Sequence, residues 1–256
     1  MTRDPHVSKK RLDSILVDRA FVSSREQAGR VILAGLVTVN GMIVDKRAKL
    51  VDEGAAIEVA DRSSSFVSRA GDKLAAAIEA FHLPCQGLIS MDIGASTGGF
   101  TDCLLRHGVK RVYAIDVGYG QLDWGIRNDP RVVVLERCNI RYLPVENVPE
   151  PIELAVIDVS FISLKLVLPC VLKFLSAQAI VIALVKPQFE AGRKQVGRGG
   201  IVRDDTVRHE VMGKVRSTAE ALGFFYLGHI DSPVEGKSGN REMLLGLRWG
   251  PESDLG

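Results

Sequence analysis

The chain has 256 residues, a net charge of +2, 46% hydrophobic residues and 25% charged residues, as in ordinary soluble globular proteins. Its longest apolar run, residues 179–185, is far shorter than the roughly 20 residues that span a bilayer. The chain begins with basic and polar residues, so we expect no signal peptide. Composition therefore argues against a membrane-spanning protein and favours a cytoplasmic location.

The four cysteines are scattered at Cys85, Cys103, Cys138 and Cys170, without a CxxC pair or a histidine at ligand spacing. This pattern predicts reduced thiols in a reducing compartment. We expect neither a disulfide framework nor a metal site.

Positive charge is concentrated near the N-terminus. Residues 1–50 hold ten Lys or Arg and five Asp or Glu, a local excess of +5. A basic module beside a nearly neutral body fits an anionic partner such as nucleic acid. On charge alone, a solvated charged face explains the excess equally well.

Residues 1–60 read as one small α+β domain. The apolar spacing within residues 9–19 predicts a helix, and Ser23 or Ser24 is a candidate N-cap for a second helix over residues 25–34. Two short β-prone runs flank Asn40-Gly41, which is a strong hairpin signal. A further strand is expected over residues 56–59.

Residues 61–67 are expected to form a linker, and residues 68–250 a second domain of alternating strands and helices. Three helices are predicted: one that starts near Ala70, one that follows the first strand and ends near His107, and one over residues 206–222. Strands are predicted over residues 88–93, 111–116, 132–135, 153–159, 179–185, 224–230 and 242–249. The alternation predicts an α/β, Rossmann-like, mainly parallel seven-stranded sheet. The last two strands lack an intervening helix, which indicates an antiparallel hairpin at one edge.

A glycine-rich segment follows the first strand of this sheet. Gly94, Gly98 and Gly99 would let the backbone approach a ligand at a helix N-terminus. Asp116 ends the next strand, where a carboxylate can accept hydrogen bonds from ribose hydroxyls. A tight structural turn is the alternative, but the combination favours a nucleotide-like ligand such as S-adenosylmethionine.

Charged residues stand where other strands meet this edge. Asp158 and Lys186 each close an apolar strand, Lys73 lies on the helix before the first strand, and Glu242 opens the last strand. Two ordinary salt bridges would explain them, but their positions favour a site in which a neutral lysine acts as a base. The loop over residues 191–203 is expected to be flexible and to contact phosphates; its basic residues are Arg193, Lys194, Arg198 and Arg203.

The chain resembles the TlyA family, whose members are ribosomal RNA 2′-O-methyltransferases of the FtsJ type, although the family was labelled hemolysin. The resemblance rests on SRAGDKL at 68–74, DIGASTGGFTD at 92–102, DVGYGQL at 116–122, ERCN at 136–139, DVSFIS at 158–163, VKPQFE at 185–190, GGIVRD at 199–204 and GNRE at 239–242. The N-terminal unit is similar to the S4 RNA-binding domain through RLD at 11–13, SREQA at 24–28 and VNG at 39–41.

The resemblance implies a class I methyltransferase that uses S-adenosylmethionine to methylate a ribose 2′-hydroxyl of ribosomal RNA, with cytidine as the expected target. It implies a catalytic tetrad of Lys73, Asp158, Lys186 and Glu242. The implied cofactor-binding residues are Asp92, Gly94, Ser96, Thr97, Gly98, Gly99, Phe100, Asp116, Val117, Asn139 and Asp158. The expected RNA contacts are Lys9, Lys10, Arg11, Arg25, Arg193, Lys194 and Arg198.

Two other functions compete with this hypothesis. A non-catalytic RNA-binding or ribosome-assembly factor would keep the N-terminal domain and a vestigial fold, but the intact tetrad argues against it. A membrane-active hemolysin would need a spanning or strongly amphipathic apolar segment, which the sequence lacks. Oligomeric state stays open.

Overall fold

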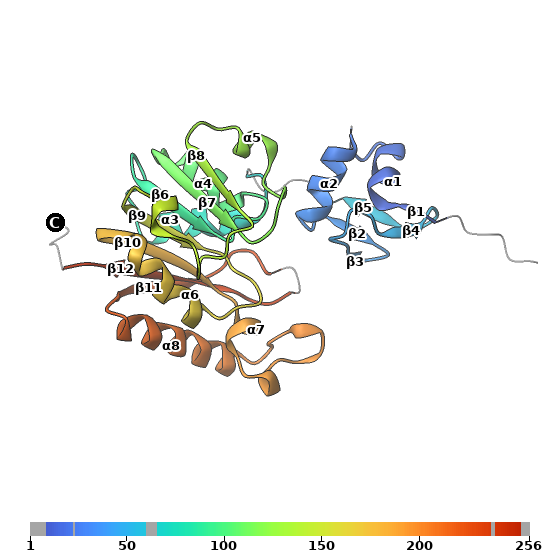
Figure 1. The fold of residues 1–256 in the computed structure, drawn as a ribbon. Helices are drawn as coiled ribbons and strands as arrows, with labels where there is room; N and C mark the ends of the chain where they lie inside the picture. Colours follow the sequence, from blue (N-terminus) through green and yellow to red (C-terminus); the bar gives the residue numbers. More distant parts are fainter. Residues whose placement is uncertain (1–8, 23, 60–65, 237–238, 252–256) are drawn as a thin grey trace, which may run out of the picture. The chain divides into compact units, whose positions relative to one another are not determined.

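The computed structural model describes residues 9–22, 24–59, 66–236 and 239–251. The chain divides into two compact units, Met1–Ser65 and Phe66–Gly256, whose elements are labelled in Figure 1. Residues 60–65, which make up most of the expected linker, lie outside the described residues. The division falls within the predicted linker.

The first unit is a small α+β fold built around two helices. Its elements are β1 (Lys9–Arg11), α1 (Leu12–Asp18), α2 (Arg25–Leu33), β2 (Val37–Val39), β3 (Met42–Ile43), β4 (Leu50–Asp52) and β5 (Ile57–Val59). β1 pairs with β4, and β2 lies between β3 and β5. A cluster that includes Leu12, Leu16 and Ile32 forms its core.

One prediction for this unit is wrong. The predicted helix includes residues 9–11, but they form β1, where Lys10 pairs antiparallel with Val51. The apolar spacing begins only at Leu12, so three consecutive basic residues have no apolar helix face to bury. Their backbone groups instead pair with β4, a strand that the sequence did not predict.

The predicted caps and turns of this unit are confirmed. Ser24 is the N-cap of α2, and its hydroxyl accepts a hydrogen bond from the Gln27 backbone N–H at 3.1 Å. Asn40 and Gly41 have φ values of 51° and 75°, as the tight hairpin turn between β2 and β3 requires. Ser23, the other candidate cap, lies outside the described residues.

The second unit is a seven-stranded sheet with helices on both faces (Figure 1). Its strands are β6 (Ile89–Ile93), β7 (Arg111–Asp116), β8 (Val132–Glu136), β9 (Ile152–Ile157), β10 (Leu175–Val185), β11 (Phe225–Asp231) and β12 (Met243–Trp249). The order is β11-β12-β10-β9-β6-β7-β8. The five strands from β10 to β8 are parallel, and β12 is antiparallel to both β10 and β11.

The predicted edge hairpin is confirmed, with one addition. β12 inserts between β10 and β11, so of the two hairpin strands only β11 lies at an edge of the sheet, and β8 forms the opposite edge. Val185 at the end of β10 is therefore the register partner of Met243 at the start of β12. This insertion brings the beginning of β12 to the carboxyl edge of the parallel strands.

Two hydrophobic clusters cover the two faces of the sheet. α3 (Ala70–Ala80), α4 (Gly99–Arg106) and the short α5 (Trp124–Arg127) pack on one face. α6 (Leu164–Val171) and α8 (Asp205–Ala221) pack on the other. α6 was not predicted, because it is short and contains Pro169, which weakens a helical signal.

Gly99 is required where α3 and α4 meet. A Cβ at this position would lie 2.2 Å from the Ser68 hydroxyl oxygen and 2.9 Å from the Ala70 Cβ. We expect Gly99→Ala to lower the free energy of unfolding by about 1–3 kcal/mol, because the helices must separate to admit the methyl group. Urea denaturation followed by circular dichroism measures the change.

Gly213 supplies the matched control. It lies inside α8, and no atom stands within 4 Å of its added Cβ. We expect Gly213→Ala to raise the free energy of unfolding by about 0.4–1 kcal/mol through the better helix propensity of alanine. Equal effects of the two substitutions would contradict the packing role of Gly99.

Candidate active site

Three strands deliver charged residues to one edge of the sheet. β9 and β10 run parallel and end there, so Asp158 and Lys186 follow their last residues. Glu242 directly precedes β12, whose first residue pairs with the last residue of β10. The Asp158 backbone N–H donates to the Ile93 carbonyl at 2.9 Å, which joins the end of β9 to that of β6.

The four predicted tetrad residues form two ion pairs at this edge. Lys186 Nζ lies 2.6 Å from Asp158 Oδ1, and Lys73 Nζ lies 2.5 Å from Glu242 Oε2. Lys73 comes from α3, which packs against β12. The side chains are 11%, 17%, 10% and 3% exposed for Lys186, Asp158, Lys73 and Glu242. Both lysines are thus largely withdrawn from water and held by carboxylates.

Ser160 is a site residue that the sequence analysis missed. Lys186 Nζ donates to its hydroxyl at 3.0 Å, so the amine is held by both Asp158 and Ser160. The neighbouring Phe161 is 91% exposed with φ 64°, and its ring centroid lies 5.1 Å from that of Phe189. An exposed aromatic ring therefore directly follows the serine that binds the Lys186 amine.

Glu190 ties the two loops that carry Asp158 and Lys186 together. Its carboxylate accepts hydrogen bonds from the Ser163 hydroxyl at 2.6 Å and the Leu164 backbone N–H at 2.7 Å. Burial raises the pKa of Glu190, while these two bonds oppose the rise. The only sequence signal was its place in the VKPQFE string. Glu190 fixes the start of α6, and with it the loop from Asp158 to Ser163.

The glycines after β6 serve different purposes. Gly94 has φ +89°, and a Cβ there would lie 2.4 Å from the Asp158 carbonyl oxygen. Gly98 is the left-handed N-cap of α4, with φ 93°. Gly99 faces α3 and the Phe100 side chain is buried in the core, so only their backbone groups can face a ligand. Thr97 is half-buried in the loop.

Asp116 ends β7 as predicted, and its carboxylate organises the glycine loop. Oδ2 accepts from the Ser96 backbone N–H at 2.8 Å, and Oδ1 accepts from the Gly118 N–H at 2.6 Å. Each carboxylate oxygen can accept a second hydrogen bond, so Asp116 can still bind ribose hydroxyls. Val117 follows Asp116 in the chain, and the Cys138 N–H donates to the Asp116 carbonyl, which brings Asn139 near. Both Val117 and Asn139 are exposed.

Asp92 lies beneath the loop. It is fully buried, and its Oδ2 accepts a hydrogen bond from the Thr101 hydroxyl at 2.7 Å, while Oδ1 has no hydrogen-bond partner among the described residues. Burial raises the pKa of Asp92 to about 7, and the charges of Asp158 and Asp116 add to the rise.

The basic loop after Lys186 contains short helical turns that the sequence did not predict. It contains α7 (Pro187–Glu190) and the 3₁₀ turns Arg193–Gln195 and Arg198–Gly200. The buried Asn240 anchors it by accepting from the Val202 N–H and donating to the Gly200 carbonyl, both at 2.9 Å. Its exposed cations are Lys194, Arg198 and Arg203; the Arg193 side chain lies outside the description.

The predicted RNA contacts of the first unit are surface cations, and three of the four are held by acidic neighbours. Lys9 is exposed. Lys10 pairs with Asp18 at 2.7 Å, while Arg11 and Arg25 both reach Asp13, at 2.7 and 3.5 Å. They belong to a compact unit separate from the tetrad.

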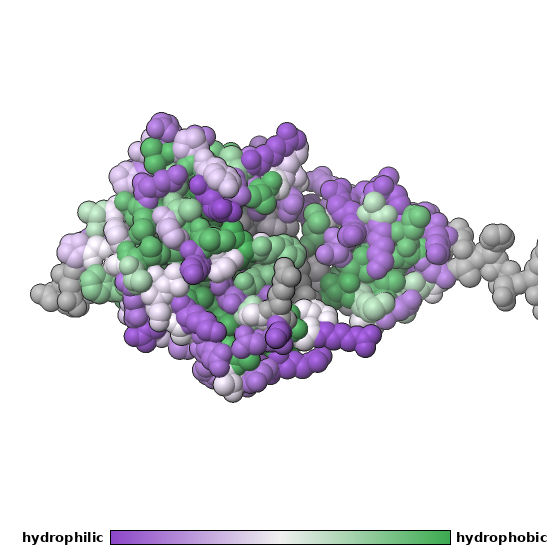
Figure 2. Space-filling model, turned by 60° about the horizontal axis from the view of Figure 1, so that its bottom comes forward, coloured by the Kyte–Doolittle hydropathy of each residue, from purple (hydrophilic) through white to green (hydrophobic). Residues whose placement is uncertain are grey.

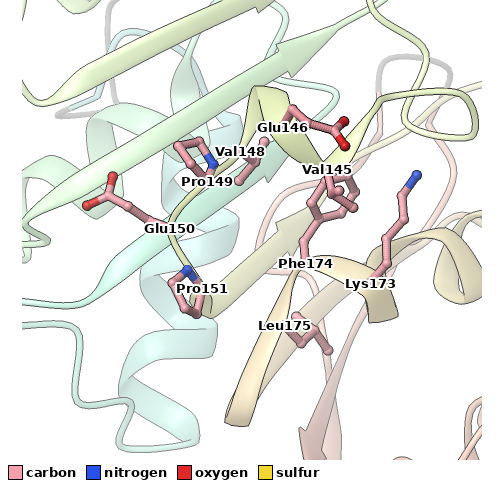
Figure 3. A pocket seen from close by; sticks show the side chains of 9 residues that line it. All are labelled: Val145, Glu146, Val148, Pro149, Glu150, Pro151, Lys173, Phe174 and Leu175. Carbon is pink, nitrogen blue, oxygen red and sulfur yellow. The ribbon is translucent and has the colours of Figure 1, made fainter.

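A hollow of about 360 Å³ lies elsewhere on the second unit (Figure 3). It is lined by Val145, Glu146, Val148, Pro149, Glu150, Pro151, Lys173, Phe174 and Leu175. Pro151 directly precedes β9 and Leu175 begins β10, so the hollow lies at the amino ends of these strands. It is remote from Asp158 and Lys186, and we assign it no role in the active site.

The fold and this edge define a class I S-adenosylmethionine-dependent methyltransferase. Residues 66–249 match the FtsJ-like methyltransferase family, and residues 10–57 match the S4 domain. The chain therefore belongs to the FtsJ-like methyltransferases, within the TlyA family.

Relatives match along nearly the whole chain. The 16S/23S rRNA (cytidine-2′-O)-methyltransferase TlyA of Mycobacterium tuberculosis is 46% identical over 94% of this chain and 90% of its own. Hemolysin A of Brachyspira hyodysenteriae is 42% identical over 91% and 98%. A solved structure from Streptococcus thermophilus, described as a hemolysin, has a TM-score of 0.74 at 43% identity and covers 97% of this chain and 92% of its own.

The described residues hold neither a metal-binding group of side chains nor a membrane-spanning helix. Among the described residues, no group of His, Cys, Asp or Glu is arranged to hold a metal ion, and the four cysteines are free thiols. No helix in the described part of the chain has the length and hydropathy of a membrane span. Both units present mixed hydrophilic and hydrophobic surfaces in Figure 2.

The residues at the carboxyl edge fit S-adenosylmethionine. Asp116 offers acceptors for the ribose, and the exposed Val117 and Asn139 offer apolar and polar contacts beside it. Gly98 is the N-cap of α4, and the first N–H groups of a helix lack intrahelical partners and favour negative charge. S-adenosylmethionine is the cofactor of this class, and nothing in the described geometry conflicts with it.

The raised pKa of Asp92 predicts a pH dependence of stability. Its folded pKa of about 7 exceeds the ordinary value of 3.8, so between these values the folded chain holds more protons than the unfolded chain. Its contribution to stability is therefore lost as pH rises from about 4 to about 7. At about 1.4 kcal/mol per pKa unit, the loss is at most on the order of 4 kcal/mol.

The D92N variant isolates this contribution, because its side chain cannot ionise. We subtract the free energy of unfolding of the wild type from that of D92N, both measured by urea titration. We expect this difference to rise between pH 4 and pH 7 by up to on the order of 4 kcal/mol. A difference independent of pH would show that Asp92 ionises normally in the folded protein.

Proposed function

We propose that the protein transfers the methyl group of S-adenosylmethionine to a ribose 2′-hydroxyl of ribosomal RNA, with cytidine as the target nucleoside. The observation that carries the proposal is the pair of buried lysine–carboxylate contacts at the carboxyl edge, Lys186–Asp158 and Lys73–Glu242. The names of the M. tuberculosis relative and the S4 match support the RNA substrate. Such a substrate is reached in the cytoplasm.

The chemistry requires alignment of the hydroxyl and removal of its proton. When bound, the cofactor supplies an electrophilic methyl group on a sulfonium. Lys186 accepts the hydroxyl proton when its amine is neutral or, as an ammonium group, only positions the hydroxyl, and Asp158 and Ser160 fix the direction of its amine. Alignment of the hydroxyl by these groups removes much of the entropic barrier.

Lys73 and Glu242 form the second half of the site. Glu242 is almost fully buried and holds the Lys73 ammonium group, which positions the ribose or its phosphate. Beneath the loop, Asp92 supports the turn from Gly94 to Gly98, and Asp116 binds the cofactor ribose. Phe161, which is exposed and follows Ser160, offers a face on which an extruded base can stack.

RNA affinity comes from surface cations of both units. Lys9, Lys10, Arg11 and Arg25 lie on the first unit, and Lys194 and Arg198, with Arg193, lie in the loop next to the active site. Contacts with phosphates fix position without reading sequence. The choice of nucleotide therefore depends on the active-site edge.

The two alternative functions find less support. A non-catalytic assembly factor would not need two buried lysine–carboxylate pairs, because withdrawing charges from water is costly unless function retains them. Hemolysin activity would rest only on the names of relatives. A liposome-leakage assay with the purified protein distinguishes this activity from methyl transfer.

Lys186→Ala tests the base assignment. We expect methyl transfer to ribosomal RNA to fall by roughly 10²–10⁴-fold, as when a general base is lost. Cofactor binding should persist, because Asp116 and the glycine loop are held by their own hydrogen bonds, from the Ser96 and Gly118 N–H groups, which do not involve Lys186. Transfer of labelled methyl to ribosomal subunits from a strain lacking this protein measures activity, and calorimetry measures cofactor binding.

Lys214→Ala is the control. Lys214 lies on α8 with a side chain 66% exposed, and its loss should leave both readouts unchanged. Retained turnover in K186A would overturn the role given to Lys186. If the wild-type protein binds the cofactor but modifies no ribosomal RNA, the proposed substrate is wrong.

Removal of the four cations of the first unit tests its role. We expect Lys9, Lys10, Arg11 and Arg25 changed together to alanine to weaken RNA binding. The slope of log affinity against log salt should also flatten, by about 0.7–0.9 for each phosphate that these side chains no longer neutralise. Anisotropy titrations at several salt concentrations measure both quantities, and an unchanged slope would count against phosphate binding by these residues.

A further inference from the structure

Asp13 of the first unit has no place in the mechanism above, yet it is among the few buried charged residues of the chain. Its side chain is 3% exposed, and it sits in the first turn of α1. Arg11 donates to it twice, from Nε to Oδ1 at 3.0 Å and from Nη2 to Oδ2 at 2.7 Å. This two-point bond fixes the plane of the guanidinium group.

Arg25 approaches the same carboxylate from another helix. Its Nη2 lies 3.5 Å from Asp13 Oδ1, so two arginines from β1 and α2 converge on one carboxylate. The hydrogen bonds from Arg11 lower the pKa of Asp13 to about 2 against the opposing effect of burial, and Arg25 adds to the lowering. The carboxylate therefore stays ionised at every pH at which RNA is handled.

The outer sides of both guanidinium groups remain accessible. The side chains of Arg11 and Arg25 are 46% and 59% exposed. The bonds of Arg11 to Asp13 use Nε and Nη2, which leaves the N–H groups of Nη1 for an outside acceptor. Two like-charged groups with outward donors would repel one another without the carboxylate between them.

A third arginine extends this face. A Cβ on Gly29 would lie 2.6 Å from Arg47 Nε, so the Arg47 guanidinium lies directly on α2. Gly29 stands four residues after Arg25, on the same side of the helix. Arg47 is exposed and was not among the predicted RNA contacts.

We infer that Asp13 is a positioning residue that holds Arg11 and Arg25 as a two-guanidinium clamp for a phosphodiester of the RNA backbone. The inference rests on the proposed function, because it assumes an RNA ligand. Phosphate is the matching ligand class, since it offers several oxygens to donors held in fixed planes. Asp13 itself points inward and does not touch the RNA.

The direction in which RNA affinity changes on Asp13→Asn distinguishes the positioning role from attraction by net charge. Asp13→Asn removes a negative charge close to the RNA, so attraction by net charge alone predicts tighter binding. The positioning role predicts weaker binding, because an amide offers one acceptor oxygen and cannot hold both nitrogens of Arg11. We expect binding of deproteinised ribosomal RNA to weaken by roughly threefold to tenfold, the effect of losing one hydrogen bond of ordinary net strength.

Glu26→Gln is the matched control. Glu26 neighbours Arg25, is exposed and undergoes the same change in charge; we expect equal or slightly tighter binding. Arg11→Lys keeps the charge but cannot form the two-point bond, and it should weaken binding as D13N does. Thermal melting establishes that each variant is folded.

A double-mutant cycle distinguishes positioning from general loss of structure. In a background with Arg11→Ala and Arg25→Ala, D13N should have no further effect on RNA binding if Asp13 acts through these arginines. An equal loss in both backgrounds, or binding by D13N as tight as by wild type, would overturn the inference. If wild-type protein bound no ribosomal RNA, both the inference and the proposed function would fail. If wild-type protein bound and methylated RNA and D13N did so equally well, only the role of Asp13 would fail.

Discussion

The active site depends on two lysine–carboxylate pairs that are held largely out of water at one edge of a sheet. Pairs of this kind add little net stability, because the loss of hydration offsets most of their attraction. In the buried Lys73–Glu242 pair, loss of a single partner would leave an uncompensated charge, which costs about 3–5 kcal/mol. Lys186–Asp158 and Lys73–Glu242 are therefore better explained by chemistry than by folding.

Strand order is what assembles these pairs. Parallel strands place Asp158 and Lys186 at the same edge because both follow a carboxyl end. Glu242 arrives from the opposite chain direction, since β12 is antiparallel and inserted beside β10. Had β12 stayed at the outer edge, Glu242 would lie one strand further out, about 4.8 Å away, and α3 could not bring Lys73 to it.

Residues with a strong local signal were predictable from sequence. Long apolar runs that end in a polar residue identified Asp158 and Lys186, and Asn40-Gly41 identified a hairpin. β1 was missed because three basic residues carry no periodicity, and α6 because it is short and contains a proline. The tetrad itself came from the family resemblance as well as from position.

Interactions that arise only in the folded chain were not predictable. Ser160, Glu190 and Asn240 stand within recognisable motifs, but nothing local shows that their side chains bind Lys186, the start of α6 and the basic loop. Glycine is similarly ambiguous: Gly98 shapes the loop for a ligand, whereas Gly99 faces a neighbouring helix. From the sequence alone, Gly98 and Gly99 are both read as ligand-binding glycines.

The division into two units separates affinity from chemistry. Cations that contact phosphates bind RNA of any sequence, so the first unit can raise the concentration of RNA near the active site without choosing a nucleotide. Under the proposed function, the choice of nucleotide then falls to the active-site edge that carries Lys186. Under the proposed function, changes in the first unit should therefore act mainly on KM, and loss of Lys186 mainly on kcat, because Lys186 is the residue assigned to the hydroxyl proton.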